Sequence, residues 1–129
     1  MSYKVELLSG EPIILQVMNS DFNVASEGEA SEQEIIRILD RQANPVFFIL
    51  DASEMSADFN DILAASFKFA QENRVLKHPK IREYIVVSQI TGLKMITEGL
   101  DTPTFGYTKV SAFNTREEAL AYVREAAQS

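Results

Sequence analysis

Residues 44–62, NPVFFILDASEMSADFNDI, contain the stretch that decides the fold. Residues 46–50 are apolar at every position and rich in β-branched and aromatic side chains, between Pro45 and Asp51. A strand that is apolar throughout, instead of at alternate positions, is typical of a strand buried on both faces of a mainly parallel sheet. The residues after it predict a loop and then a long helix. We therefore expect a domain built around this strand, loop and helix.

Four further segments have the length and composition of strands: residues 3–8, 12–18, 84–87 and 109–113. The first two are separated by Ser9-Gly10-Glu11. A short loop with glycine between two such segments predicts an antiparallel hairpin. Residues 19–30 are mostly polar and predict a connecting loop.

Helices are predicted over residues 31–42, 58–76 and 91–98, and from residue 115 to about 127. The first and last of them begin with a capping box, formed by Ser31 with Glu34 and by Thr115 with Glu118. Apolar residues follow at helical spacing in each segment. His78-Pro79 is expected to stop the second helix, since proline disfavours helical geometry in the residue before it.

The predicted order of elements is β-β-α-β-α-β-α-β-α within a single domain over residues 1–129. Strands that alternate with helices require crossover connections, which are right-handed in nearly all cases. We expect an α/β fold with a five-stranded, mostly parallel sheet, an N-terminal antiparallel hairpin at its edge and four helices.

Composition limits the classes of function. The 129 residues include 46% apolar residues, no cysteine, and twelve basic against nineteen acidic residues, for a net charge of −7. A field of this sign repels phosphate backbones and anionic lipid headgroups, so no nucleic acid and no membrane partner is expected. The absence of cysteine fits a reducing compartment. With no signal peptide or membrane-spanning segment visible, we expect a cytoplasmic protein.

The arrangement of a hairpin, repeated αβ units and the segment FFILDAS before a long helix resembles the SpoIIAA-like group. This group comprises the STAS domains of anti-sigma-factor antagonists and small stand-alone bacterial proteins whose function is generally unassigned. Residues 81–87 (IREYIVV) and 110–123 (VSAFNTREEALAYV) extend the resemblance, and the second segment looks like the closing strand and helix of the stand-alone proteins. The resemblance implies the SpoIIAA-like fold.

In the antagonists, a serine at the start of the helix after the central strand is phosphorylated, which switches partner binding. Their Asp-Ser-Ser-Gly-like segment is replaced here by EMSADF at residues 54–59, without paired serines or glycine. The resemblance therefore places this chain nearer the stand-alone proteins. The nearest candidates for such a switch are Ser53 and Ser56.

The carboxyl ends of parallel strands are where ligand-binding loops converge. We expect a regulatory or binding crest there, and its candidate residues are Ser53, Ser56, Asp58, Ser88, Gln89 and Thr91, with Asp51, Glu54 and Asn114 beside them. The same residues are also explained as turn and capping residues, because Ser56 or Asp58 can accept from the exposed N–H groups of the second helix.

The sequence carries little that points to catalysis, a metal or a cofactor. His78 is the only histidine, and its place at a helix end is explained by the helix dipole. The five glycines are isolated from one another, so no phosphate-binding loop is present. Asp51 lacks the acidic pair that a magnesium-dependent phosphoacceptor needs. We expect a protein that is not an enzyme, with no cofactor and no metal.

The central strand presents apolar residues to both faces of the sheet, with Phe48 and Leu50 on one face and Phe47 and Ile49 on the other. If all helices lie on one face, covering the other requires residues 19–30 or a partner, because large apolar patches rarely stay exposed on monomers. The loop with Pro103, Phe105 and Tyr107 is a second candidate contact surface; the alternative is that these aromatic residues close the core.

Two functions follow as hypotheses. The first is a regulatory or protein-interaction module that binds a protein partner or a second copy of itself, most simply as a homodimer. The second is a binder or carrier of a small apolar, lipid-like ligand. It is suggested by the apolar sheet and by Phe67, Phe69, Met95 and Phe105, although 129 residues leave little chain for a lid.

Overall fold

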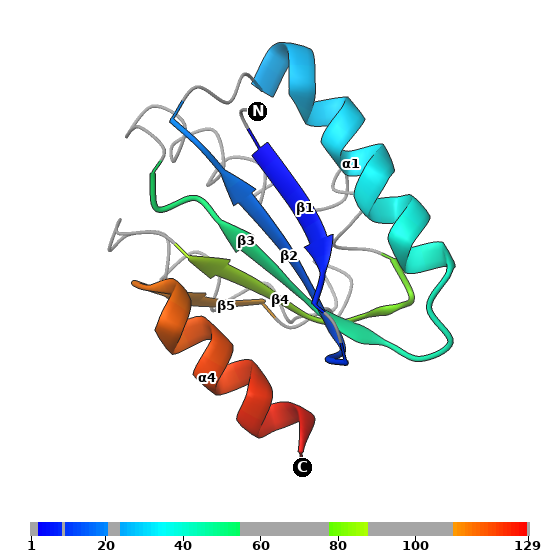
Figure 1. Ribbon diagram of the computed structural model, residues 1–129, viewed down its shortest axis with the longest axis vertical. Coiled ribbons are helices and arrows are strands. Elements are labelled where there is room, and N and C mark those ends of the chain that lie inside the picture. Colours follow the sequence, from blue (N-terminus) through cyan, green and yellow to red (C-terminus); the bar gives the residue numbers. More distant parts are fainter. Residues whose placement is uncertain (1–2, 9, 21–23, 55–77, 88–109, 129) are drawn as a thin grey trace.

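The computed structural model describes residues 3–8, 10–20, 24–54, 78–87 and 110–128. Their secondary structure follows the chain in the order shown in Figure 1: β1 (Tyr3–Leu7), β2 (Ile13–Met18), α1 (Val24–Asp40), β3 (Val46–Asp51), β4 (Ile81–Val87), β5 (Val110–Phe113) and α4 (Arg116–Ala127). The helices predicted over residues 58–76 and 91–98 lie outside the described residues.

The five described strands form one sheet in the order β1-β2-β3-β4-β5. β1 is antiparallel to β2, and every other neighbouring pair is parallel. The hairpin turns through Gly10, whose φ of 73° lies in the left-handed region that glycine adopts without steric cost. The predicted mostly parallel sheet with an antiparallel first strand at its edge is confirmed, and β3 lies at its centre.

The two faces of the sheet carry two apolar cores, as the alternation along β3 predicted. Phe48 and Leu50 pack with Leu39 of α1, while Phe47 and Ile49 pack with Val123 of α4. Figure 1 shows α1 and α4 on opposite sides of the sheet. Hence the closing helix of the chain itself packs on the second face. The condition under which residues 19–30 or a partner would have to cover it, with all helices on one face, does not hold.

The first helix was predicted to begin at Ser31 and instead begins at Val24. Ser31 is a buried residue inside the helix, so it does not form the predicted N-terminal capping box. Residues 19–30 are mostly polar, which suggested a loop, yet most of residues 24–30 are good or tolerable helix formers. Gly28, inside this segment, costs only about 1 kcal/mol relative to alanine, which packing of the helix against the sheet can offset.

The other described elements follow the predictions more closely. Thr115 caps α4, and its Oγ1 accepts from the backbone N–H of Glu118 at 3.2 Å. β4 begins at Ile81, three residues before its predicted start, because Arg82 and Glu83 are accommodated in the strand. The Arg82 guanidinium lies 4.9 Å from the centre of the Phe47 ring, a cation–π contact.

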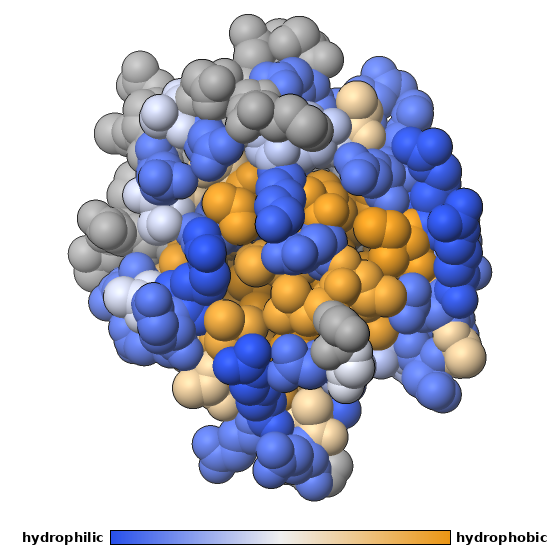
Figure 2. Space-filling model, in the orientation of Figure 1, coloured by the Kyte–Doolittle hydropathy of each residue, from blue (hydrophilic) through white to orange (hydrophobic). Residues whose placement is uncertain are grey.

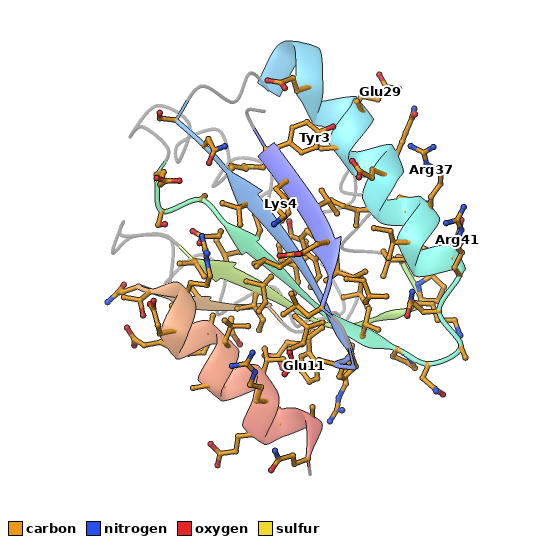
Figure 3. All side chains as sticks on the ribbon, in the orientation of Figure 1. Tyr3, Lys4, Glu11, Glu29, Arg37 and Arg41 are labelled. Carbon is orange, nitrogen blue, oxygen red and sulfur yellow. The ribbon has the colours of Figure 1, made fainter. Side chains whose placement is uncertain are left out.

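Polar contacts fasten the ends of the elements together. Arg124 of α4 donates to Glu11 of the hairpin turn (labelled in Figure 3) at 2.8 Å, and this hydrogen bond and the charge of Glu11 raise the pKa of the Arg124 guanidinium. At the opposite side, His78 and Asp40 of α1 are joined at 2.7 Å, while His78 Nδ1 accepts from the N–H of Lys80. His78 therefore has a structural role between α1 and β4.

None of the helices described is long and apolar enough to cross a membrane.

Candidate functional site

Asp51, the last residue of β3, is the centre of a polar cluster at the carboxyl end of the sheet. Its side chain is only 3% exposed. Oδ1 accepts from the backbone N–H of Ser53 at 3.0 Å and from the Ser53 hydroxyl at 2.6 Å, and Oδ2 accepts from Arg116 Nε at 2.7 Å. We call Asp51, Ser53 and Arg116 the crest cluster.

The parallel sheet brings Arg116 to Asp51, which lies 65 residues away in the sequence. Ala52 N–H donates to the carbonyl of Val87 at 2.9 Å, so the chain continues along the end of β4 after leaving β3. Val87 is in register with Phe113, the last residue of β5. Since α4 begins with Arg116, three residues after β5 ends, its first side chain reaches Asp51.

The geometry of the crest cluster satisfies the buried carboxylate and leaves binding capacity at the surface. Asp51 has donors on both oxygens, as a buried charge requires. The Ser53 hydroxyl donates its only proton to Asp51 and keeps its acceptor lone pairs. Arg116 is 42% exposed, and its guanidinium has five N–H donors, of which Nε–H is directed to Asp51. The cluster can therefore offer positive charge to an acidic group from outside.

Of the predicted crest residues, Ser53 lies in the crest cluster. Ser56, Asp58, Ser88, Gln89 and Thr91 lie outside the described residues, as do Pro103, Phe105 and Tyr107 of the predicted contact loop. Among the residues named beside them, Asp51 is in the cluster, while Glu54 and Asn114 are exposed next to it.

Arg116 was missed as a site residue, although the sequence holds a signal for it. A cation in the first turn of a helix is disfavoured by the helix dipole, and Glu117 and Glu118 beside it follow the usual preference. An arginine at this position, directly after a strand that ends at the crest, indicates a carboxylate partner elsewhere in the fold.

A second polar cluster lies inside the sheet face covered by α4. Glu83 of β4 is 5% exposed, and its carboxylate accepts from Ser111 Oγ at 2.7 Å and from the Tyr122 hydroxyl at 2.7 and 2.9 Å. The Tyr122 ring also packs against Phe113 with 5.1 Å between ring centres. This cluster joins β4, β5 and α4, and it supports the helix that carries Arg116. Its signal in the sequence is the glutamate in the otherwise mostly apolar segment IREYIVV.

Gln16 of β2 is a third buried polar residue, on the face covered by α1. It is 3% exposed and lies between Ile14 and Met18, which belong to the apolar core of that face. Within the described ranges, its Nε2 is a buried side-chain donor without a hydrogen-bond partner. An unsatisfied buried donor costs about 1–3 kcal/mol of stability, so the unpaired Nε2 of Gln16 needs an explanation.

The described ranges contain no group of three or more His, Asp or Glu side chains that could hold a metal ion. The carboxylates of the two polar clusters are instead engaged by serine, tyrosine and arginine donors.

Comparison with solved structures shows a counterpart for the fold. An uncharacterized DUF3478 family protein from Shewanella loihica PV-4, described as having a SpoIIAA-like fold, matches with a TM-score of 0.53 and 11% sequence identity. The match covers 94% of this chain and 91% of that chain. No family model and no curated protein matches the sequence. The chain thus has a SpoIIAA-like fold, as its sequence resemblance implied, and at this identity the likeness extends to the fold alone.

Proposed function

We propose that this protein is a non-catalytic regulatory module that binds a protein partner through the crest cluster. The observation that carries the proposal is the arrangement of Ser53, Asp51 and Arg116, with a serine hydroxyl and an arginine sharing one buried carboxylate at the ends of three strands. A surface of this kind recognises an acidic partner group through Arg116, because a guanidinium binds carboxylates and phosphates with defined geometry.

The same arrangement makes partner binding sensitive to negative charge at Ser53. A phosphate on Ser53 would repel the Asp51 carboxylate and attract the Arg116 guanidinium, since it adds nearly two negative charges and strong acceptor oxygens. Arg116 would then exchange its bond with Asp51 for bonds with the phosphate. The cluster would lose the positive charge that it offers to a partner.

The bonding of Asp51 supports a binding role over a catalytic one. A general base must accept a proton from a substrate or nucleophile at its operating pH. Asp51 is buried, and both of its carboxylate oxygens already accept hydrogen bonds, one from Ser53 and the other from Arg116. The pair of Ser53 and Asp51 therefore lacks the free base that an activated serine needs.

The test is capture of a partner from source lysate by the wild-type chain and by Ser53→Glu. We expect Ser53→Glu to reduce recovery of the partner at least about tenfold, equivalent to about 1.4 kcal/mol of binding free energy. Asn44→Glu is the matched control. It adds the same charge at an exposed position before β3, at the opposite end of the sheet, and should leave recovery unchanged. Equal recovery with both variants, or no partner with any of them, would contradict the proposal. Intact-mass measurement of native protein reports whether phosphate is present.

A second candidate function, binding of a small apolar ligand, is favoured by Gln16. The unpaired Nε2 of Gln16 would be satisfied by a ligand with a hydrogen-bond acceptor and an apolar body, such as a fatty acid. This candidate predicts that native mass spectrometry detects a bound small molecule and that fatty acids raise the melting temperature.

Gln16→Met tests this candidate, because it removes the amide and nearly keeps the volume. The variant should raise the free energy of unfolding of the ligand-free protein by about 1–2 kcal/mol, since an unsatisfied buried donor is lost. It should also abolish any thermal shift that saturated fatty acids produce in the wild type. A fatty-acid shift that persists in Gln16→Met, or its absence from the wild type, counts against ligand binding at this residue.

A further inference from the structure

No other strand of the described residues pairs with the outer edge of β1. β1 is an end strand of the sheet, and Figure 1 shows it in front of the other strands in this view. Leu8 N–H donates to the carbonyl of Ile13, so the backbone groups of residues 8, 6 and 4 point toward β2. By alternation, the backbone groups of Tyr3, Val5 and Leu7 point away from β2. An edge of this kind is a template for pairing with another strand.

One face of β1 carries apolar side chains that a neighbouring apolar surface could cover. Leu7 is 43% exposed and is the exposed large apolar side chain of the described residues. Figure 2, seen from the same side as Figure 1, shows apolar residues gathered in the middle of the view. Tyr3 and Val5 pack at the margin of the core on the face that α1 covers. Figure 3 shows Tyr3 turned toward α1. An additional strand would cover Leu7.

The other face of β1 carries two opposite charges two residues apart. Lys4 and Glu6 stand opposite Val17 and Leu15 of β2, and they form an ion pair of 3.6 Å between Lys4 Nζ and Glu6 Oε1. Both side chains are well exposed, so this pair contributes little to stability and can exchange partners. When the strand is read in the opposite direction, the positive charge of Lys4 falls at the position of the negative charge of Glu6, and the negative charge falls at that of Lys4.

We propose that a second copy of this chain binds along β1, with the two β1 strands antiparallel about a two-fold axis at Val5. The two Val5 residues then exchange backbone hydrogen bonds, and Leu7 stands opposite Tyr3 of the second copy. Lys4 stands opposite Glu6 of the second copy, and Glu6 opposite its Lys4. These are positions without backbone hydrogen bonds, where facing side chains approach most closely.

Charge selects this register over its neighbours. An axis at Lys4 places two lysines opposite each other, and an axis at Glu6 places two glutamates opposite each other; like charges in facing positions are destabilising. An axis at Val5 gives opposite charges in both flanking pairs and keeps all of β1 in the pairing. The interface is isologous, as closed two-fold assemblies require.

This pairing goes beyond the proposed function and does not rest on it. The β1 edge and the crest cluster are separate surfaces. The pairing joins the two sheets into one and leaves Ser53 and Arg116 of both copies outside the new strand pair. Each copy would thus present its own crest cluster, and two crest clusters in one dimer raise the avidity for a partner with two acidic segments.

A charge exchange measured by sedimentation equilibrium tests the inference. Lys4→Glu and Glu6→Lys each replace two opposite-charge pairs with like-charge pairs, so each should raise the dimer dissociation constant at least about tenfold. The double variant Lys4→Glu/Glu6→Lys restores complementarity and should return to within about threefold of the wild type. An equimolar mixture of the two single variants should form a heterodimer. Circular dichroism and thermal melting check that each variant is folded.

Val5→Pro provides a test independent of charge. Proline removes an N–H that points to the open edge, a position where edge strands tolerate it, so the monomer should fold while the dimer is lost. A wild type that is monomeric at every concentration, or single charge variants that dimerise as tightly as the wild type, would overturn the inference. If such a monomer still captured a partner in a Ser53-dependent way, the crest proposal would stand alone. If the dimer depended on these charges but capture did not depend on Ser53, the β1 pairing would stand and the crest proposal would fail.

Discussion

Replacement of Glu83 by alanine should lower the free energy of unfolding by about 3–5 kcal/mol. The substitution leaves a cavity between β4, β5 and α4. It also deprives the hydroxyl groups of Ser111 and Tyr122 of their acceptor. Because a part-buried hydroxyl group that loses an acceptor carries a desolvation cost, the loss exceeds that of the side-chain volume alone. Urea denaturation followed by circular dichroism measures the difference, at an unchanged m-value if the native state is retained.

Glu83→Gln is the matched control for this prediction. The amide keeps the volume and one acceptor oxygen, so the expected cost is about 1–2 kcal/mol. Tyr122→Phe removes one donor and should cost about 1 kcal/mol. In a double-mutant cycle, Glu83→Gln and Tyr122→Phe should be non-additive, because the two side chains share a hydrogen bond. Additive effects, or an alanine variant that is as stable as the wild type, would show that the cluster does not hold α4 on the sheet.

Replacement of Asp51 by alanine should lower the free energy of unfolding by about 2–3 kcal/mol. The change removes the acceptor for two bonds from Ser53 and one from Arg116. Breaking a fully buried ion pair costs about 3–5 kcal/mol, but Arg116 is half-exposed and regains water, so the expected value is smaller. Partner capture should fall as well, because both Ser53 and Arg116 lose their fixed positions.

Asp51→Asn separates the charge of Asp51 from the geometry of the turn. Asparagine still accepts from Ser53, but it presents an amide donor to Arg116 or loses that contact. We expect a cost of about 1–2 kcal/mol in the same unfolding measurement. In a cycle with Arg116→Ala, Asp51→Ala should show a coupling of about 1 kcal/mol or more. A coupling near zero would mean that the hydrogen bond between the two side chains contributes nothing to stability in solution.

Local patterns were enough to predict much of the sheet. The uninterrupted apolar run at residues 46–50 predicted a central strand, and Gly10 with its neighbours predicted the hairpin; both are confirmed. Thr115 also formed the predicted cap. In these cases the physical cause lies within a few residues, in burial on both faces, permitted backbone angles or a single hydrogen bond.

The failures occurred where distant packing outweighs local preference. Ser31 and Glu34 have the spacing of a capping box, yet α1 starts seven residues earlier because its first turns gain from packing of the whole helix. The start of β4 was placed too late because a glutamate is unfavourable in a buried strand unless donors surround it. Ser111 and Tyr122, far away in the sequence, supply those donors.

By itself, the sequence determined that this chain forms a mostly parallel α/β sheet around residues 46–50 and that Ser53 lies at its crest. Only the tertiary structure decided that α4 packs on the second face, that Arg116 binds Asp51 across 65 residues, and that β1, with Lys4 and Glu6, is an end strand of the described sheet. The reason is that the burial of a strand follows from the amino-acid composition of its own segment. The pairing of two charged groups instead depends on where the fold brings them together.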